Sequence, residues 1–206
     1  MTEYEQIQKV KYRSFESDNE KWKAGQRRCI SIFVQPHLPP MTKEQKEYFN
    51  ILDCACGDGV GLDVFRSFGY QPVGIEFEEE KIKRAKAKGH NVRNYDMHDP
   101  HLSKVRECFD VVYSSHSLEH AHDPEMVLHN FYEMLKPEGK LFLVLPFPDR
   151  GPDDAHCGKY KLRTAVEYSA TTAPLMDVLE GCGFKWEEVR LDTWREEEVW
   201  VRARKI

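Results

Sequence analysis

The residues best suited to ligand chemistry lie in one stretch, ILDCACGDGVG, which runs from Ile51 to Gly61. It combines a carboxylate, two thiols and three glycines that alternate with other residues. Glycine has no Cβ, so its backbone can approach a ligand closely. Three interpretations fit this composition: a loop that holds a nucleotide-like ligand, a metal site, or a buried strand that ends in a turn.

The metal site is the least supported of these three interpretations. The chain has six cysteines but no C-x-x-C pair, the spacing found in zinc ribbons and thioredoxin-like redox motifs. Imidazole is the commonest metal ligand, and several histidines lie close together in the sequence: His116, His120, His122 and His129. We predict no metal site, and we expect His129 to be a surface or packing residue.

Alternating strand and helix patterns must position the glycine stretch. The predicted strands cover residues 49–55, 71–77, 90–96, 109–115 and 140–148. The predicted helices cover residues 60–69, 78–89, 123–139 and 171–183. This alternation implies a mostly parallel sheet covered on both faces. Residues 184–206 form a hairpin pattern, and a short turn joins antiparallel strands, so the last strand should enter the sheet antiparallel.

In such sheets, ligands bind outside the carboxyl ends of the strands, next to the first strand-to-helix turn. Glu76 ends the second predicted strand, where a carboxylate can accept hydrogen bonds from both hydroxyls of a ribose. The dinucleotide fingerprint G-x-G-x-x-G fits Gly57 and Gly59, but Leu62 stands at its third glycine. Asp53 would repel a pyrophosphate, and it suits a ligand with a positive charge instead.

Taken together, these motifs resemble those of class I S-adenosylmethionine-dependent methyltransferases. ILDCACGDGVG resembles the first motif, an acid followed by G-x-G-x-G, with Ala55 where the first glycine normally lies. VGIEF resembles the second motif, and NYDMHD resembles the segment after the third strand. The stretch from FDVVYSSHSLEH to LKPEGKLFLVLP resembles the fourth and fifth motifs. The match covers residues 50–146 and, more loosely, the terminal hairpin.

The resemblance implies a three-layer α/β sandwich with a seven-stranded, mostly parallel sheet in the order 3-2-1-4-5-7-6 and strand 7 antiparallel. The antiparallel last strand agrees with the hairpin inferred from the residues alone. Residues 1–40 are expected to form an N-terminal helical cap or lid, with packing of their aromatic side chains against the sheet as the alternative. Residues 41–206 are expected to form the methyltransferase domain.

The resemblance also implies a site for S-adenosylmethionine, with S-adenosylhomocysteine as the product. Glu76 would bind the ribose, with Phe77 beside the adenine. Asp96 would bind the adenine amino group, and Met97 would pack on the ring. The full implied set of cofactor-binding residues is Asp53, Ala55, Cys56, Gly57, Gly59, Glu76, Phe77, Asp96, Met97, Ser114 and Ser115.

The implied reaction is in-line methyl transfer to a nucleophilic atom of a small-molecule acceptor, without a metal. Metal-dependent relatives place a carboxylate after the fourth strand, where Ser114 and Ser115 stand here. His116 follows at the position where the methyl group would lie, which makes it the candidate general base or a substrate contact. A pocket-lining histidine without chemistry is the alternative. Leu118 and His156 are the candidate substrate contacts.

Composition narrows the partners of the protein. The net charge of −5 over 206 residues argues against a nucleic-acid substrate. No apolar run approaches the ~20 residues that span a bilayer, and the first residues lack the apolar core of a signal peptide. We therefore expect a cytoplasmic protein without a membrane partner, and no pattern indicates an oligomeric state.

Two other functions share this architecture. A dinucleotide-dependent oxidoreductase is disfavoured by Leu62 and by the absence of a downstream catalytic Tyr/Lys pattern. A non-catalytic, S-adenosylmethionine-binding partner subunit would have a degraded first motif or a blocked pocket, and Ala55 alone is too small a departure to indicate one.

Overall fold

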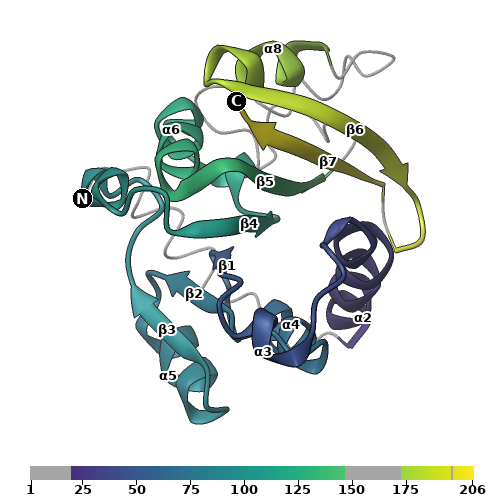
Figure 1. Cartoon of the computed structure of the whole chain (residues 1–206), viewed down its shortest axis with the longest axis vertical. Coiled ribbons are helices and arrows are strands. Elements are labelled where there is room, and N and C mark those ends of the chain that lie inside the picture. Colours follow the sequence, from purple (N-terminus) through teal and green to yellow (C-terminus); the bar gives the residue numbers. More distant parts are fainter. Residues whose placement is uncertain (1–19, 147–172, 196) are drawn as a thin grey trace.

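The computed structural model describes residues 20–146, 173–195 and 197–206, which form one seven-stranded sheet (Figure 1). The strands are β1 Ile51–Cys54, β2 Val73–Glu76, β3 Asn91–Asn94, β4 Phe109–Ser115, β5 Leu135–Pro146, β6 Phe184–Asp192 and β7 Glu198–Lys205. Their order is β3-β2-β1-β4-β5-β7-β6. Strands β1 to β5 pair in parallel, and β7 is antiparallel to β5 and β6. The predicted strand order and directions are confirmed.

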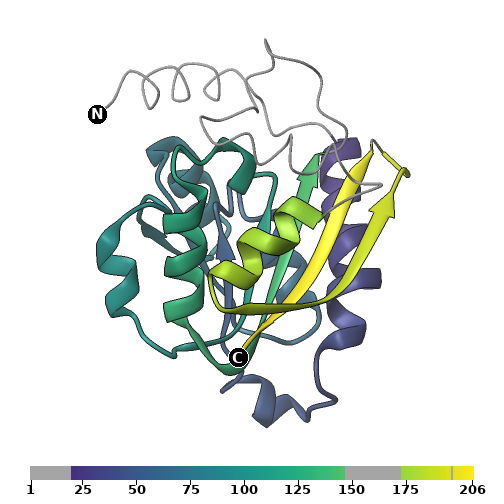
Figure 2. The ribbon, with the colours of Figure 1, turned by 90° about the horizontal axis from the view of Figure 1, so that it is seen from above.

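Helices cover both faces of this sheet, so the fold has three layers. Figures 1 and 2 show α6 and α8 on one face and α2 with α4 on the other. The helices, including short 3-10 and π turns labelled η, are α2 Glu20–Cys29, η1 Ile30–Val34, η2 Gln35–His37, α3 Lys43–Lys46, α4 Val60–Ser67, α5 Glu79–Ala87, η3 Pro100–Lys104, η4 Leu118–His120, α6 Pro124–Met134 and α8 Ala173–Gly181. None of the described helices is both long enough and apolar enough to cross a membrane.

Strand β4 shows how the two halves of the core share one sheet. Val111 and Tyr113 pack with residues of η1 and α4, whereas Val112 packs with residues of α6 and α8. All three are at most 1% exposed. Successive side chains of a strand point to opposite faces, so a strand buried on both faces appears in the sequence as a continuous apolar run.

The helix predicted over residues 123–139, with residues 137–139 closing it, ends earlier than expected. Asp123 caps the helix as expected, and its carboxylate accepts a hydrogen bond from the first turn at 3.0 Å. The helix ends at Met134, and Leu135 already belongs to β5, where it pairs with β4. Pro137 explains the early end, since proline disfavours the helical conformation of the residue before it and has no N–H to donate.

The described part of the N-terminal segment packs into the core. Cys29, Ile30, Phe33 and Val34 are at most 2% exposed. The ring of Phe33 lies 5.5 Å from that of Trp200 on β7. These four side chains, at the end of α2 and in η1, therefore share the core of the sheet, and a domain division at residue 40 stays a prediction.

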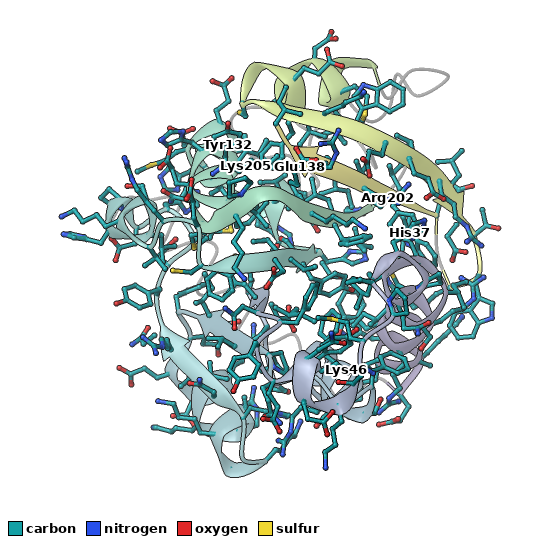
Figure 3. All side chains as sticks on the ribbon, in the orientation of Figure 1. His37, Lys46, Tyr132, Glu138, Arg202 and Lys205 are labelled. Atoms are coloured by element: carbon teal, nitrogen blue, oxygen red, sulfur yellow. The ribbon has the colours of Figure 1, made fainter. Side chains whose placement is uncertain are left out.

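The C-terminal strand is held at its far end by polar contacts with α6 and β5. Tyr132 and Lys205, labelled in Figure 3, come from α6 and β7, and Lys205 Nζ lies 4.4 Å from the centre of the Tyr132 ring. Tyr132 donates a hydrogen bond to the carbonyl of Ile206 at 2.8 Å. The antiparallel register then places Glu198, the first residue of β7, opposite Pro146 at the carboxyl end of β5.

Candidate cofactor and acceptor site

The turn after β1 has left-handed backbone conformations at three residues. The φ angles are 58° at Ala55, 54° at Gly57 and 83° at Gly59. Glycine adopts this conformation readily, whereas an L-residue such as alanine is strained there by roughly 1–2 kcal/mol. A Cβ added at Gly57 would meet no atom within 4 Å. This side of the turn is therefore open to a ligand.

The glycine that breaks the dinucleotide spacing has a structural explanation. A Cβ at Gly61 would collide with the carboxylate of Asp53. Gly74 on β2 similarly makes room for Cys56, whose Sγ would lie 2.6 Å from an added Cβ. The Cys56 side chain packs with Leu62 in an apolar cluster, and burial raises the pKa of its thiol. Cys56 can therefore contribute to the turn through its backbone.

Glu76 joins the second motif to the glycine turn. It is 3% exposed, and its Oε2 accepts a hydrogen bond from the backbone N–H of Gly57 at 3.0 Å. Its Oε1 accepts from the N–H groups of Phe77 at 2.9 Å and Glu78 at 3.0 Å. The structure thus brings the predicted ribose-binding acid to the open side of the turn. Ribose binding itself stays a prediction.

Asp53 lies beside Glu76 and is 4% exposed. Burial, reinforced by the negative charge of Glu76, raises the pKa of Asp53 to about 8. Within the part of the chain that the structure describes, no cationic side chain forms an ion pair with Asp53. The carboxyl group therefore carries a proton at neutral pH, and an ammonium group placed nearby would favour its ionised form. The two carboxyl groups of Asp53 and Glu76 therefore fit the cationic methionine end of S-adenosylmethionine.

The residues predicted to hold adenine follow β2 and β3. Burial tends to raise the pKa of Asp96, but hydrogen bonds from His98 outweigh it and lower the pKa. These bonds come from the His98 backbone at 2.9 Å and its Nδ1 at 2.8 Å. The Asp96 side chain is still 43% exposed, so it remains accessible to a ligand. Phe77 is half-buried, and Met97 packs against the core.

A small cavity lies at the same edge of the sheet, beyond the end of β4. Its lining includes His116 and Ser115 after β4, Trp22 of α2, and Arg195 and Glu198 at the start of β7. The His116 backbone has φ 50°, and its N–H donates to the carbonyl of Val144 at 2.9 Å. Residues held in strained conformations cluster at functional sites. The cavity has no room for even a water molecule in this structure, so its lining residues, and not its volume, mark the candidate acceptor end of the site.

His116 is enclosed on several sides in this cavity. Its Nε2 lies 3.0 Å from Oε1 of Glu198 and 3.4 Å from Nη2 of Arg195. Its Nδ1 lies 3.6 Å from Oε1 of Glu119. The Trp22 ring meets the imidazole edge-on, with 4.6 Å between the ring centres. The structure thus places the predicted base in a wall of charged and aromatic groups.

The remaining predicted residues have different surroundings. Ser114 is 2% exposed and forms a short hydrogen bond with Ser117, so its hydroxyl faces away from solvent. Leu118 is 1% exposed and packs with the residues of α6. The 3-10 turn after β4 directs this apolar side chain into the core, and the expected substrate contact stays a prediction. His156 lies outside the described residues.

Sequence reasoning missed two members of the cavity wall, Arg195 and Glu198. Both lie in the stretch WREEEVW, which reads as a polar turn before the last strand. A signal was nevertheless available. The antiparallel direction of β7 brings its first residues to the carboxyl ends of the parallel strands, where ligands bind.

Comparison with known proteins identifies the family. A family model described as a methyltransferase domain matches residues 12–187. The mitochondrial ubiquinone biosynthesis O-methyltransferase of Rattus norvegicus is 32% identical over 109 residues, which cover 46% of this chain and 30% of that protein. The matched region thus spans about a third of that curated relative.

Solved structures support the same fold. An S-adenosylmethionine-dependent methyltransferase from Mesorhizobium loti has a TM-score of 0.63 and 19% identity, over 90% of this chain and 97% of that one. Magnesium protoporphyrin IX methyltransferase from Synechocystis PCC 6803, solved with bound S-adenosylmethionine, has a TM-score of 0.63 and 13% identity, over 90% of this chain and 80% of that one. Since the family model covers most of the sequence, the chain belongs to the methyltransferase domain family and has the fold of class I S-adenosylmethionine-dependent methyltransferases.

Proposed function

We propose that this protein binds S-adenosylmethionine and methylates an oxygen atom of a small-molecule acceptor, without a metal. One observation carries the proposal. The open side of the glycine turn, with Glu76 and the uncompensated Asp53, lies at the same edge of the sheet as the cavity that contains His116. Bound S-adenosylmethionine would supply a methyl group already activated by its sulfonium.

The cofactor end needs three kinds of contact, and residues of β1 to β3 can make each of them. Glu76 would accept hydrogen bonds from the ribose hydroxyls. Asp53 would balance the positive charge of the methionine end. Asp96 would accept from the adenine amino group, with Phe77 and Met97 against the ring. These roles are proposals that follow the family resemblance residue by residue.

The acceptor end has to orient a hydroxyl group and remove its proton. Methyl transfer requires the acceptor atom at about 3–3.5 Å from the methyl carbon and in line with the bond that breaks. His116 would take the hydroxyl proton, since it lies in the cavity wall with one ring nitrogen held by Glu198. An oxygen acceptor is supported by the O-methyltransferase name of the rat relative.

The alternative functions are weaker on the same geometry. A pyrophosphate would meet the buried carboxyl groups of Asp53 and Glu76, which disfavours a dinucleotide oxidoreductase. The pairing of His116 with Glu198 in a cavity favours an enzyme over a non-catalytic subunit.

Methyl transfer from radiolabelled S-adenosylmethionine to a panel of phenols and catechols tests the proposal. His116→Gln should slow transfer by about 100-fold or more, because general base catalysis contributes roughly 10²–10⁴-fold. Its affinity for S-adenosylmethionine should stay within about twofold of wild type. His129→Gln is the matched control, since His129 is exposed on α6. Equal rates for wild type and His116→Gln would contradict the role of His116, and failure to bind S-adenosylmethionine would contradict the whole proposal.

A further inference from the structure

Glu198 lines the cavity, and both of its carboxylate oxygens have hydrogen-bond partners. Its Oε1 lies 3.0 Å from Nε2 of His116 and accepts a hydrogen bond from Nη2 of Arg195 at 2.6 Å. Its Oε2 accepts from the indole N–H of Trp200 at 2.9 Å. Both oxygens therefore have donors in different directions, and this arrangement fixes the plane of the carboxylate.

The donor beneath Glu198 is itself part of the core. Trp200 is 1% exposed, and its ring packs against Phe33 at 5.5 Å between centres. The guanidinium groups of Arg28 and Arg190 lie 5.4 and 5.2 Å from the centre of the same ring. A buried indole in such contacts has little freedom to rotate. Glu198 is thus anchored to the rigid part of the sheet.

The charge of Glu198 determines which ring nitrogen of His116 carries a proton. Burial acts to raise the pKa of Glu198, but hydrogen bonds from His116, Trp200 and Arg195 outweigh it and lower the pKa to about 2. Glu198 is therefore ionised at neutral pH, and an ionised carboxylate only accepts hydrogen bonds. The hydrogen bond between the two side chains then requires a proton on Nε2 of His116, so Nδ1, which lies 3.6 Å from Oε1 of the buried Glu119, is the ring nitrogen left to exchange a proton.

We infer that Glu198 is a positioning residue, which orients the His116 imidazole so that Nδ1 takes the proton of the acceptor hydroxyl. This inference rests on the proposed methyl transfer. The proton passes from the acceptor oxygen to Nδ1, while the Nε2 proton stays in the hydrogen bond to Glu198. The resulting imidazolium is stabilised by the fixed negative charge. The other charged groups that face the ring are Glu119, whose Oε1 lies 3.6 Å from Nδ1, and Arg195.

The hydrogen bond can be tested without knowing the acceptor. An imidazole N–H bonded to a carboxylate gives a downfield proton resonance, which can be assigned to Nε2 of His116 by nitrogen labelling and by its loss in His116→Gln. The resonance should be present in wild type and absent in Glu198→Gln. Its absence from wild type, or its persistence in Glu198→Gln, would overturn the inference.

Glu188→Gln is the matched control for this measurement. Glu188 of β6 also lies between a histidine and an arginine, 3.2 Å from Nε2 of His37 and 3.5 Å from Nη2 of Arg202. Figure 3 labels His37 and Arg202, which lie close together beside β6 and β7. Neither residue lines the cavity. This variant should therefore retain the His116 resonance and the wild-type rate.

A comparison of two acceptors then separates positioning from a general structural role. A phenol must lose its proton, whereas a nitro-substituted thiophenol is already a thiolate at pH 8. Glu198→Gln should slow transfer to the phenol by about 10- to 100-fold and leave transfer to the thiolate within about twofold. Equal losses for both acceptors would overturn the positioning role. Glu198→Asp keeps the charge and should recover part of the rate with the phenol.

A second variant covers the case in which Glu198→Gln does not fold. Trp200→Phe keeps Glu198 and removes one of the donors that orient it, so an intermediate loss with the phenol alone is expected. If the wild-type protein binds no S-adenosylmethionine, the proposed function is contradicted. If the wild-type protein methylates both acceptors and Glu198→Gln keeps the full rate, only this inference is contradicted.

Discussion

Two buried acids at the same edge of the sheet differ in charge at neutral pH: Asp53 is protonated and neutral, whereas Glu198 is ionised. Asp53 at the end of β1 is 4% exposed, and Glu198 at the start of β7 is 5% exposed. The pKa of Asp53 is raised to about 8, first by burial and then by the charge of Glu76. Burial acts in the same direction on Glu198, yet hydrogen bonds from His116, Trp200 and Arg195 lower its pKa to about 2.

The two acids differ in whether the protein itself compensates their negative charge. Around Glu198 the compensating groups belong to the chain, whereas around Asp53 a ligand would have to supply them. Burial disfavours both carboxylates, and the number of donors around each decides its charge. Glu198 has its compensating partners within the chain, so its negative charge is part of the folded protein. Asp53 lacks them among the described residues, and a cationic ligand can supply the compensation.

Removing the ribose acid should have the largest effect on the cofactor end. Glu76→Ala should weaken S-adenosylmethionine binding by about 100-fold, because a net loss of roughly 1.5–3 kcal/mol is typical for a hydrogen bond to a charged group and about 1.4 kcal/mol is tenfold in affinity. Calorimetric titration measures this change. Glu80→Ala on the exposed face of α5 is the control and should bind as wild type does. Unchanged affinity in Glu76→Ala would contradict the site assignment.

Neutralising the compensated acid should destabilise the protein. Glu198→Gln is expected to lower the free energy of unfolding by about 2–3 kcal/mol at pH 7, since a pKa lowered from 4.5 to about 2 stabilises the folded state. This contribution is fully present above pH 4.5 and is lost as the pH falls towards 2. Urea unfolding at several pH values should therefore show the two proteins converging in acid. A constant difference across this range would contradict the charge assigned to Glu198.

Neutralising the uncompensated acid should have the opposite sign. In Asp53 the folded-state pKa of about 8 lies above the ordinary 3.8, so the folded protein keeps a proton that the unfolded chain loses between these values. Wild-type stability should thus fall as the pH rises from about 4 to 8, and Asp53→Asn should remove this slope. We expect the variant to gain about 3–5 kcal/mol at pH 8 in the same unfolding experiment, since each pKa unit corresponds to about 1.4 kcal/mol. If Asp53→Asn and Glu198→Gln destabilise the protein equally, the contrast between the two acids is wrong.

The smallest expected effect concerns the turn beside Asp53. Ala55→Gly should relieve the left-handed strain of roughly 1–2 kcal/mol, and the greater freedom of glycine in the unfolded chain offsets part of this gain. A net stabilisation of about 0.5–1 kcal/mol is expected from thermal or urea unfolding. Destabilisation by a similar amount would show that Ala55 is not strained in solution.

The two ends of the site also differ in how far the sequence alone predicts them. The glycine turn and the carboxyl groups beside it are predictable because Asp53, the glycines and Glu76 lie at fixed spacings along consecutive strands, and their role in binding a cofactor stays a prediction. The sheet order follows from the same motifs together with the terminal hairpin. Pro137 signals the end of α6 in the sequence, but the helix ends earlier, at Met134, because Leu135 already pairs with β4.

The acceptor end depends on contacts that no local spacing encodes. Glu198 is one of three consecutive glutamates, and only the register of β7 against β5 determines that it faces the cavity. Its partner His116 lies 82 positions away in the sequence. Leu118 is predicted as a substrate contact, and the burial of its side chain in the core likewise depends on the fold around it.

The most direct test of the account is calorimetric titration of the protein with S-adenosylmethionine, S-adenosylhomocysteine and NADH, in two buffers with different ionisation enthalpies. We expect binding of the first two only. Both ligands should release a proton from the protein at pH 7, because Asp53 ionises when a ligand ammonium lies beside it. Their affinity should increase as the pH rises towards 8. Binding of NADH alone, or no binding of S-adenosylmethionine, would contradict the account.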